Sequence, residues 1–112
     1  MYEYHATITK VYDGDTVTAD IDLGFKTFRT DMKLRLYGIN APEMRGEERE
    51  QGIISRNWLR EQILGKQVII HTQKDKQGKY GRWLAEIFLP ENINQSINRQ
   101  LIEKGLAVTA NY

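Results

Sequence analysis

The stretch YHATITKVYDGDTVTADI, Tyr4 to Ile21, contains the pattern that decides the fold. Tyr4 to Val11 and Thr16 to Ile21 alternate apolar or β-branched residues with polar ones, which is typical of strands that bury one face. Asp13-Gly14-Asp15 separates the two runs, and Asp-Gly between alternating runs favours a tight turn. The stretch therefore predicts a β-hairpin.

A third strand is predicted from Lys26 to Tyr37, after a turn at Leu23-Gly24. Its apolar residues share one parity: Phe28, Met32, Leu34 and Leu36. Its charged residues share the other parity: Arg29, Asp31, Lys33 and Arg35. We expect one face of this strand to pack against the core and the other face to be polar.

Two helices are predicted from apolar residues at helical spacing. The first runs from about Glu48 to Leu64, with Gly65 as its stop, and its apolar stripe is Ile54, Trp58, Leu59 and Ile63. The second ends at Gly105 and carries Ile93, Ile97 and Leu101. Asn94 and Asn98 are both suitable residues to cap its start, so two starting points remain open.

Gln67 to Gln73 and Trp83 to Leu89 predict a second hairpin around the turn DKQGKYGR. The expected order is thus three strands, a helix, two strands and a helix, in one domain that spans residues 1–112. This order is typical of a mainly β protein with helices (the α+β class), built on a five-stranded Greek-key barrel of the oligonucleotide-binding (OB) type.

The composition excludes several classes of protein. The 112 residues are 40% apolar and 28% charged, the formal net charge is +1, and cysteine is absent, so disulfides and thiolate metal sites are excluded. MYEYHATITK has no apolar core of a signal peptide, and no run is long enough to cross a membrane. We expect a monomer without a membrane partner, cytoplasmic or phage-encoded by default, with a trimmed secreted form still open.

Four features could carry chemistry, and each has an ordinary structural alternative. Asp15 could bind a cation, or Asp-Gly-Asp is only a turn. Asn40, Ala41 and Glu43 in INAPE could converge beside Pro42, or the segment is only a strand end. Arg35 could bind a phosphate, or it lies on a solvated sheet face.

The fourth feature is the basic hairpin with Lys74, Lys76, Lys79 and Arg82 around Tyr80. It could bind phosphates, or its lysines only prevent edge pairing at a hairpin tip. The two histidines, His5 and His71, are expected to be half-buried strand residues rather than zinc ligands. The remaining donors are oxygen atoms, which suit calcium or magnesium.

Taken together and in this order, VYDGDTV, KLRLYGINAPE, DKQGKYGRWLAEIF and INRQLIEKGLA resemble the staphylococcal (thermo)nuclease family of calcium-dependent phosphodiesterases on an OB barrel. The resemblance covers nearly the whole chain. It implies Asp15, Asn40 and the Ala41 carbonyl as calcium ligands and Glu43 as the group that orients or deprotonates the attacking water. It also implies catalytic roles for Arg35 and Arg82 at the scissile phosphate, and contacts of Lys79 and Tyr80 with a neighbouring phosphate.

The resemblance predicts an endonuclease that hydrolyses DNA, RNA or both with little sequence specificity. Position 40 is Asn where many family members carry Asp, so we expect weaker calcium binding or a preference for magnesium or another divalent cation. Two alternatives remain open. One is a non-catalytic OB module that binds nucleic acid or protein, and the other is a structural or partner-binding domain whose polar face is only solvated surface.

Overall fold

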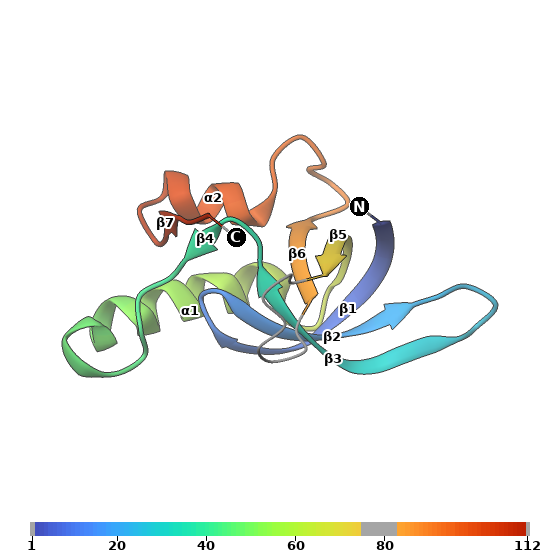
Figure 1. The fold of residues 1–112 in the computed structure, drawn as a ribbon, viewed down its shortest axis with the longest axis horizontal. Coiled ribbons are helices and arrows are strands. Elements are labelled where there is room, and N and C mark those ends of the chain that lie inside the picture. Colours follow the sequence, from blue (N-terminus) through green and yellow to red (C-terminus); the bar gives the residue numbers. More distant parts are fainter. Residues whose placement is uncertain (1, 75–82, 112) are drawn as a thin grey trace.

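The computed structural model describes residues 2–74 and 83–111, and within these residues five strands close into a barrel (Figure 1). The barrel strands are β1 (Tyr2–Asp13), β2 (Thr16–Asp22), β3 (Phe28–Leu36), β5 (Gln67–Lys74) and β6 (Trp83–Phe88). The remaining elements are β4 (Ile39–Asn40), η1 (Gly46–Glu48), α1 (Arg49–Ile63), α2 (Ile97–Glu103) and β7 (Val108–Thr109). The predicted order of strands and helices is confirmed, with the β4–β7 pair as an addition.

The barrel closes in the order β1-β2-β3-β6-β5, and β5 pairs back with β1. The ladders β1–β2, β2–β3, β5–β6 and β1–β5 are antiparallel, whereas β3 and β6 pair in parallel. This parallel ladder joins Leu34 to Trp83, Arg35 to Leu84 and Leu36 to Ala85. We call it the barrel seam. It holds the backbone of Arg35 in the wall of the barrel, and the OB-type architecture is confirmed.

The β1–β2 hairpin forms where the Asp-Gly-Asp turn predicts it. Asp13 Oδ1 accepts a hydrogen bond from the Asp15 amide at 3.0 Å, so the side chain closes the turn. Gly14 has a second role, because a Cβ atom there would lie 2.7 Å from Ala41 Cβ. The glycine thus allows the INAPE segment to approach the hairpin tip.

The core fills the barrel from alternating positions of its strands, with helices at its ends (Figure 1). Fully buried side chains include Ile8, Val17, Leu34, Ile70 and Ile87. Leu59 and Ile63 of α1 and Leu101 of α2 add to the same cluster. In the described part of the chain, neither helix combines the length and apolar character that a bilayer span requires.

The prediction for the polar and apolar faces of β3 is wrong in two places. Phe28 is 56% exposed, because β2 and β3 continue beyond the barrel as a two-stranded arm (Figure 1). An arm outside the barrel has no core against which to bury either face. Conversely, Arg35 is only 8% exposed, so the solvated-face alternative for this residue is wrong.

Both helices differ in detail from the prediction. In α1, Ile54 is 51% exposed, and Ser55 and Gly52 are buried in its place. Helix α2 begins at Ile97 with neither asparagine as its cap, because Ser96 Oγ accepts from the Arg99 amide at 3.1 Å. Ile93 precedes the helix and is exposed. His71 is half-buried as predicted, but His5 is exposed.

Candidate active site

A cleft of about 930 Å³ opens where the end of β3, the β1–β2 turn, the segment after β4 and the segment before β7 meet. Five of the predicted site residues line it: Asp15, Arg35, Asn40, Ala41 and Glu43. These residues are up to 28 positions apart in the sequence, and the fold brings them to one hollow.

Asp15 and Arg35 form a buried ion pair in this cleft. Arg35 Nη2 lies 3.2 Å from Asp15 Oδ2, and the two side chains are only 10% and 12% exposed, respectively. Arg35 Nη1 also donates to the Asp15 carbonyl at 3.2 Å. Thr16, beside Asp15, pairs with Arg35 across the β2–β3 ladder. The guanidinium is therefore fixed by both the backbone and the side chain of the turn.

Asn40 and Ala41 complete the same hydrogen-bond network. Asn40 Oδ1 accepts from Arg35 Nη2 at 2.6 Å, and the Ala41 amide donates to Asp15 Oδ2 at 2.8 Å. Arg35 Nη2 thus bridges two oxygen atoms, Asp15 Oδ2 and Asn40 Oδ1. In this structure the guanidinium holds the two side-chain oxygens that the family resemblance assigns to a cation.

Close packing against Gly14 and Gly52 and pairing with β7 position the segment that contains Asn40, Ala41 and Glu43. A Cβ atom on Gly52 of α1 would lie 2.2 Å from the Glu43 carbonyl, so only glycine lets this segment lie against the helix. On the other side, Asn40 pairs with Val108 in the β4–β7 ladder. Ser55 Oγ donates to the Leu106 carbonyl at 2.6 Å, which ties α1 to the C-terminal segment.

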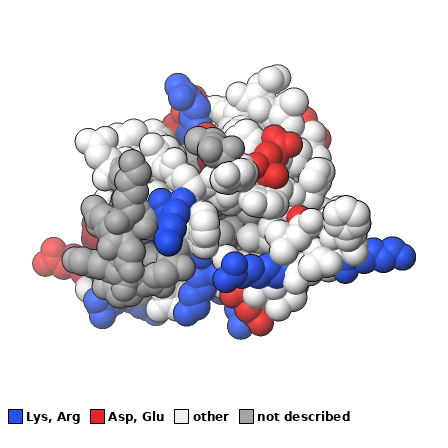
Figure 2. All heavy atoms as spheres, turned by 45° about the vertical axis from the view of Figure 1, so that its right-hand side comes forward, with Lys and Arg blue, Asp and Glu red and all other residues white. Residues whose placement is uncertain are grey.

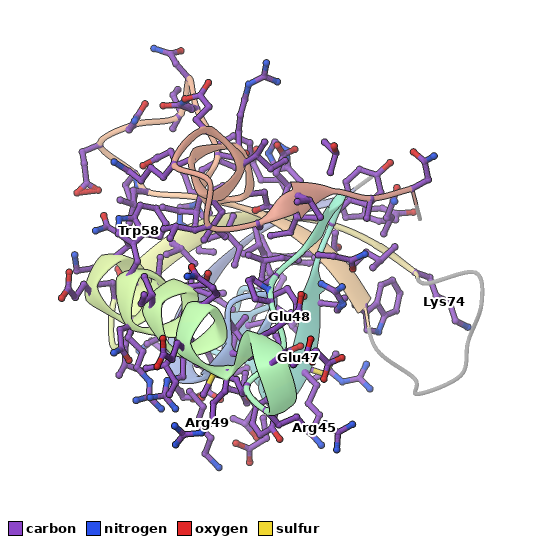
Figure 3. The ribbon with its side chains drawn as sticks, turned by 90° about the vertical axis from the view of Figure 1, so that its left-hand side faces the viewer. Arg45, Glu47, Glu48, Arg49, Trp58 and Lys74 are labelled. Carbon is purple, nitrogen blue, oxygen red and sulfur yellow. The ribbon has the colours of Figure 1, made fainter. Side chains whose placement is uncertain are left out.

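Glu43 lies at the rim of the cleft and not in its base. Its side chain is 64% exposed, and Oε2 lies 3.5 Å from Nε of Arg45. Its amide donates to Glu48 Oε1 at 3.2 Å, so the start of the helical region holds its backbone. Figure 3 shows Glu48 near the centre of the view, where η1 approaches the strands, with Arg45 at the lower edge. The Glu43 carboxylate can therefore turn toward a substrate in the cleft.

Burial raises the pKa of Asp15 to about 6. The neighbouring Asp13 side chain adds to this effect through a hydrogen bond and through its charge, while the Ala41 amide and Arg35 lower the pKa. Burial wins because the pair has little water around it. At neutral pH Asp15 is mostly a carboxylate whose charge is incompletely compensated, which is the state that a bound cation stabilises.

The oxygen donors of the cleft are of the chemical types that bind a hard divalent cation. Asp15 offers a carboxylate, Asn40 an amide oxygen and Ala41 a backbone carbonyl. Within residues 2–74 and 83–111, however, no three histidine or acidic side chains gather into a group that could hold a metal. The donor set therefore suits calcium or magnesium but carries few charges.

The predicted residues Lys79, Tyr80 and Arg82 lie outside the described residues. The strands on either side are described, and Lys74 pairs with Trp83, so the predicted second hairpin is confirmed up to that pair. Figure 3 shows Lys74 on the far side of the barrel from α1.

Sequence reasoning missed several residues that line the cleft, namely Tyr12, Met44, Arg45, Glu48 and Leu106. It also missed Asn98, which is buried in α2. Asn98 Nδ2 donates to the carbonyls of Tyr37 and Ala85 at 2.9 and 3.0 Å, and its Oδ1 accepts from the Ile87 amide at 3.0 Å. The only signal in the sequence is a polar residue on the apolar face of a predicted helix. The prediction treats Asn98 as a possible cap of that helix and not as a buried residue.

Comparison with known proteins agrees with this architecture. Residues 33–112 match the family model of staphylococcal nuclease homologues. An uncharacterised protein of Methanocaldococcus jannaschii is 27% identical over 126 residues, which cover 93% of this chain and 58% of that protein. A thermonuclease of Staphylococcus intermedius is 27% identical over 103 residues, covering 89% of this chain and 56% of that protein. The chain spans a little over half the length of these two relatives. The chain belongs to the family of staphylococcal nuclease homologues.

Proposed function

We propose that the protein is a metal-dependent nuclease, a thermonuclease-like endonuclease that hydrolyses phosphodiester bonds of DNA, RNA or both. One observation carries the proposal. The buried side chains of Arg35 and Asp15 contact each other at the base of a cleft, and the exposed carboxylate of Glu43 lies at its rim. A cation-binding group, a phosphate-binding group and a base for water are the three parts that phosphodiester hydrolysis needs.

Arg35 is the group that would bind the scissile phosphate. A guanidinium presents fixed paired donors that match two phosphate oxygens, and charge grows on those oxygens during in-line attack. Its Nη2 already contacts Asp15 and Asn40, so phosphate binding requires one of these contacts to be exchanged. Arg82 would be the second such arginine, as the family resemblance implies.

Asp15, Asn40 and the Ala41 carbonyl would hold the cation, calcium by resemblance and magnesium as the alternative that Asn40 leaves open. Such an ion supplies positive charge at the reacting phosphate and lowers the pKa of a water molecule. Asp15 Oδ2 now accepts from both Arg35 Nη2 and the Ala41 amide. We therefore expect Arg35 to turn an N–H group toward the substrate when Asp15 Oδ2 and Asn40 Oδ1 bind the cation instead of the guanidinium.

Glu43 would orient the attacking water and accept its proton. It is exposed enough to rotate, and its backbone is fixed by Glu48 and by the contact with Gly52. Phosphate contacts carry little base information, which accounts for low sequence specificity. Lys79 and Tyr80 would add contacts to a neighbouring phosphate.

The test is digestion of plasmid DNA, single-stranded DNA and RNA with calcium, magnesium or chelator, using wild type, Glu43→Gln and Glu47→Gln. Glu47 is an exposed carboxylate of η1 that does not line the cleft, so it is a matched control. We expect Glu43→Gln to lower the rate on the order of 10²-fold or more and Glu47→Gln to leave it within two-fold. Cutting in chelator, or equal rates for the two variants, would refute the assignment.

A non-catalytic binding module is the second candidate. The amide at Asn40 and the absence of an acidic cluster within the described residues favour it, because both weaken metal binding. Oligonucleotide binding with no cutting under any metal condition would establish it.

A further inference from the structure

A second hollow of about 1140 Å³ adjoins the cleft and shares Tyr12, Thr16 and Met44 with it. It lies between the outer face of β1, β2 and β3 and one side of α1. We call it the α1 groove, and define it by Lys10, Tyr12, Lys33, Arg56, Arg60 and Leu64. The candidate active site does not use its charged residues.

The α1 groove is positively charged. Lys10, Lys33, Arg56 and Arg60 line it, and no acidic residue does. Within the described part of the chain none of these four forms an ion pair, whereas Arg45 and Arg99 lie within 4 Å of a glutamate. Figure 3 shows side chains with terminal nitrogen atoms below α1, near the labelled Arg49. Figure 2, which turns α1 away from the viewer, shows Lys and Arg together with a few Asp or Glu along the lower part of the molecule.

Strand register connects the groove directly to Arg35. Lys10 pairs with Thr18, and Thr18 pairs with Lys33, so these three side chains form one row across β1, β2 and β3. Thr16 and Arg35 form the next row on the same face. Two residues along a strand span about 7 Å, so Lys33 lies one row beyond Arg35. A polynucleotide with one phosphate at Arg35 would therefore continue over Lys33.

The groove also has apolar surfaces that suit bases. Tyr12 is 74% exposed and lines both the groove and the cleft. Leu64 is 43% exposed at the other end, and Met44 lies between the two hollows. Among the described residues, Arg56 donates only to the neutral Asn57 Oδ1, so its charge is not neutralised. An exposed aromatic ring beside cations that lack an acidic partner suits single-stranded nucleic acid, since the ring stacks on a base while the cations contact the phosphates.

We propose that the α1 groove binds a stretch of single-stranded polynucleotide that extends from the cleft, with Lys10, Lys33, Arg56 and Arg60 at its phosphates and Tyr12 against a base. The inference rests on the proposed nuclease function, because the strand is the substrate of the cleft. It adds a second binding surface beyond the cleft, which a mononucleotide is too short to reach.

Binding without cutting tests this inference separately from catalysis. A fluorescein-labelled 12-nucleotide oligothymidylate is titrated with Glu43→Gln protein in chelator, and affinity is read from anisotropy at several salt concentrations. The groove variant is Lys33→Gln with Arg60→Gln, both exposed positions. The control is Lys26→Gln with Arg99→Gln, two exposed cations outside the groove that give the same change in net charge.

We expect the groove variant to bind on the order of ten-fold more weakly at low salt, with the slope of log affinity against log salt reduced by about 1.4. The control should bind within two-fold of the parent. Lys10→Gln with Arg56→Gln should repeat the loss, which covers the case in which the first variant does not fold. Equal affinities for groove and control variants overturn the inference, even if the wild type cuts DNA.

Tyr12 gives an independent readout. Tyr12→Ala should weaken binding of the 12-mer at least about five-fold, and Tyr12→Phe, which keeps the ring, should restore it. Equal losses for the two variants would remove stacking from the proposal. Two further results would overturn the ligand class: a duplex bound as tightly as the single strand, or displacement of the 12-mer by an equal concentration of polyglutamate peptide of the same charge.

Discussion

Replacement of Asp15 by Asn should stabilise the metal-free protein at neutral pH, although Asp15 is central to the candidate site. Burial raises the pKa of Asp15 from 3.8 to about 6. The folded protein therefore binds more protons than the unfolded chain between these pH values, and its stability falls as the pH rises through this range. The difference corresponds to roughly 3 kcal/mol at pH 7, an upper bound because the pair keeps some contact with water.

The assay is urea unfolding of wild type and Asp15→Asn in chelator at pH 4, 5, 6 and 7. At pH 4 wild-type Asp15 is mostly protonated when folded, so the two proteins should have similar free energies of unfolding. At pH 7 the variant should be more stable by up to about 3 kcal/mol. The gain should develop as the pH rises through the interval between 3.8 and about 6.

A saturating divalent cation should reverse the order at pH 7, because binding to the folded state at about 1,000 times the dissociation constant contributes about 4.1 kcal/mol to the wild type. The variant, which lacks the carboxylate, should gain little. A variant that is less stable than wild type at pH 7 in chelator would refute the reasoning, because it would show that the contact with Arg35 outweighs the cost of burial.

Three further changes test other parts of the site. Arg35→Lys keeps the charge but loses the paired donors, so turnover per folded molecule should fall on the order of 10²-fold; near-normal turnover would remove Arg35 from the mechanism. Asn98→Ala takes a partner from the Ile87 amide and the Tyr37 carbonyl, while the Ala85 carbonyl keeps its hydrogen bond from the Tyr37 amide. The change should lower the free energy of unfolding by about 3 kcal/mol, against about 0.5 kcal/mol or less for the exposed control Asn94→Ala; similar melting temperatures would contradict this. Gly52→Ala should displace Glu43 from α1 and reduce activity while the barrel stays folded, whereas unchanged activity would show that the segment can shift without consequence.

Much of the barrel was predictable because its signals are local. The alternation in Tyr4 to Ile21 and the Asp-Gly turn depend on neighbours in the sequence, and the hairpin forms as expected. The β4–β7 pair was not predictable, since two-residue strands carry no periodic signal. Whether Phe28 packs against the core depends on the residue at which β3 leaves the barrel, and the alternation of apolar and polar residues does not show where the barrel ends.

The grouping of Asp15, Arg35, Asn40 and Glu43 was predicted from a resemblance of motifs, and the structure places these residues around one cleft. Their environment was not predictable. The burial of Arg35 depends on the close approach of the INAPE segment, which Gly14 and Gly52 permit through contacts with residues 27 and 9 positions away, respectively. The basic residues of the α1 groove are spread over β1, β3 and α1, so no cluster is visible in the chain.

The barrel seam has a consequence for when the candidate active site forms during folding. Arg35 pairs with Leu84, 49 positions later in the chain, and Asn98 of α2 links the carbonyls of Tyr37 and Ala85 on the two sides of this ladder. Contacts between such distant positions close late, because a long loop must lose its conformational freedom first. A chain that lacks β6 can form the β1–β2 hairpin but cannot fix Arg35 of β3 in the barrel wall. The candidate site is therefore expected to form only after β6 has paired with β3 and α2 has docked.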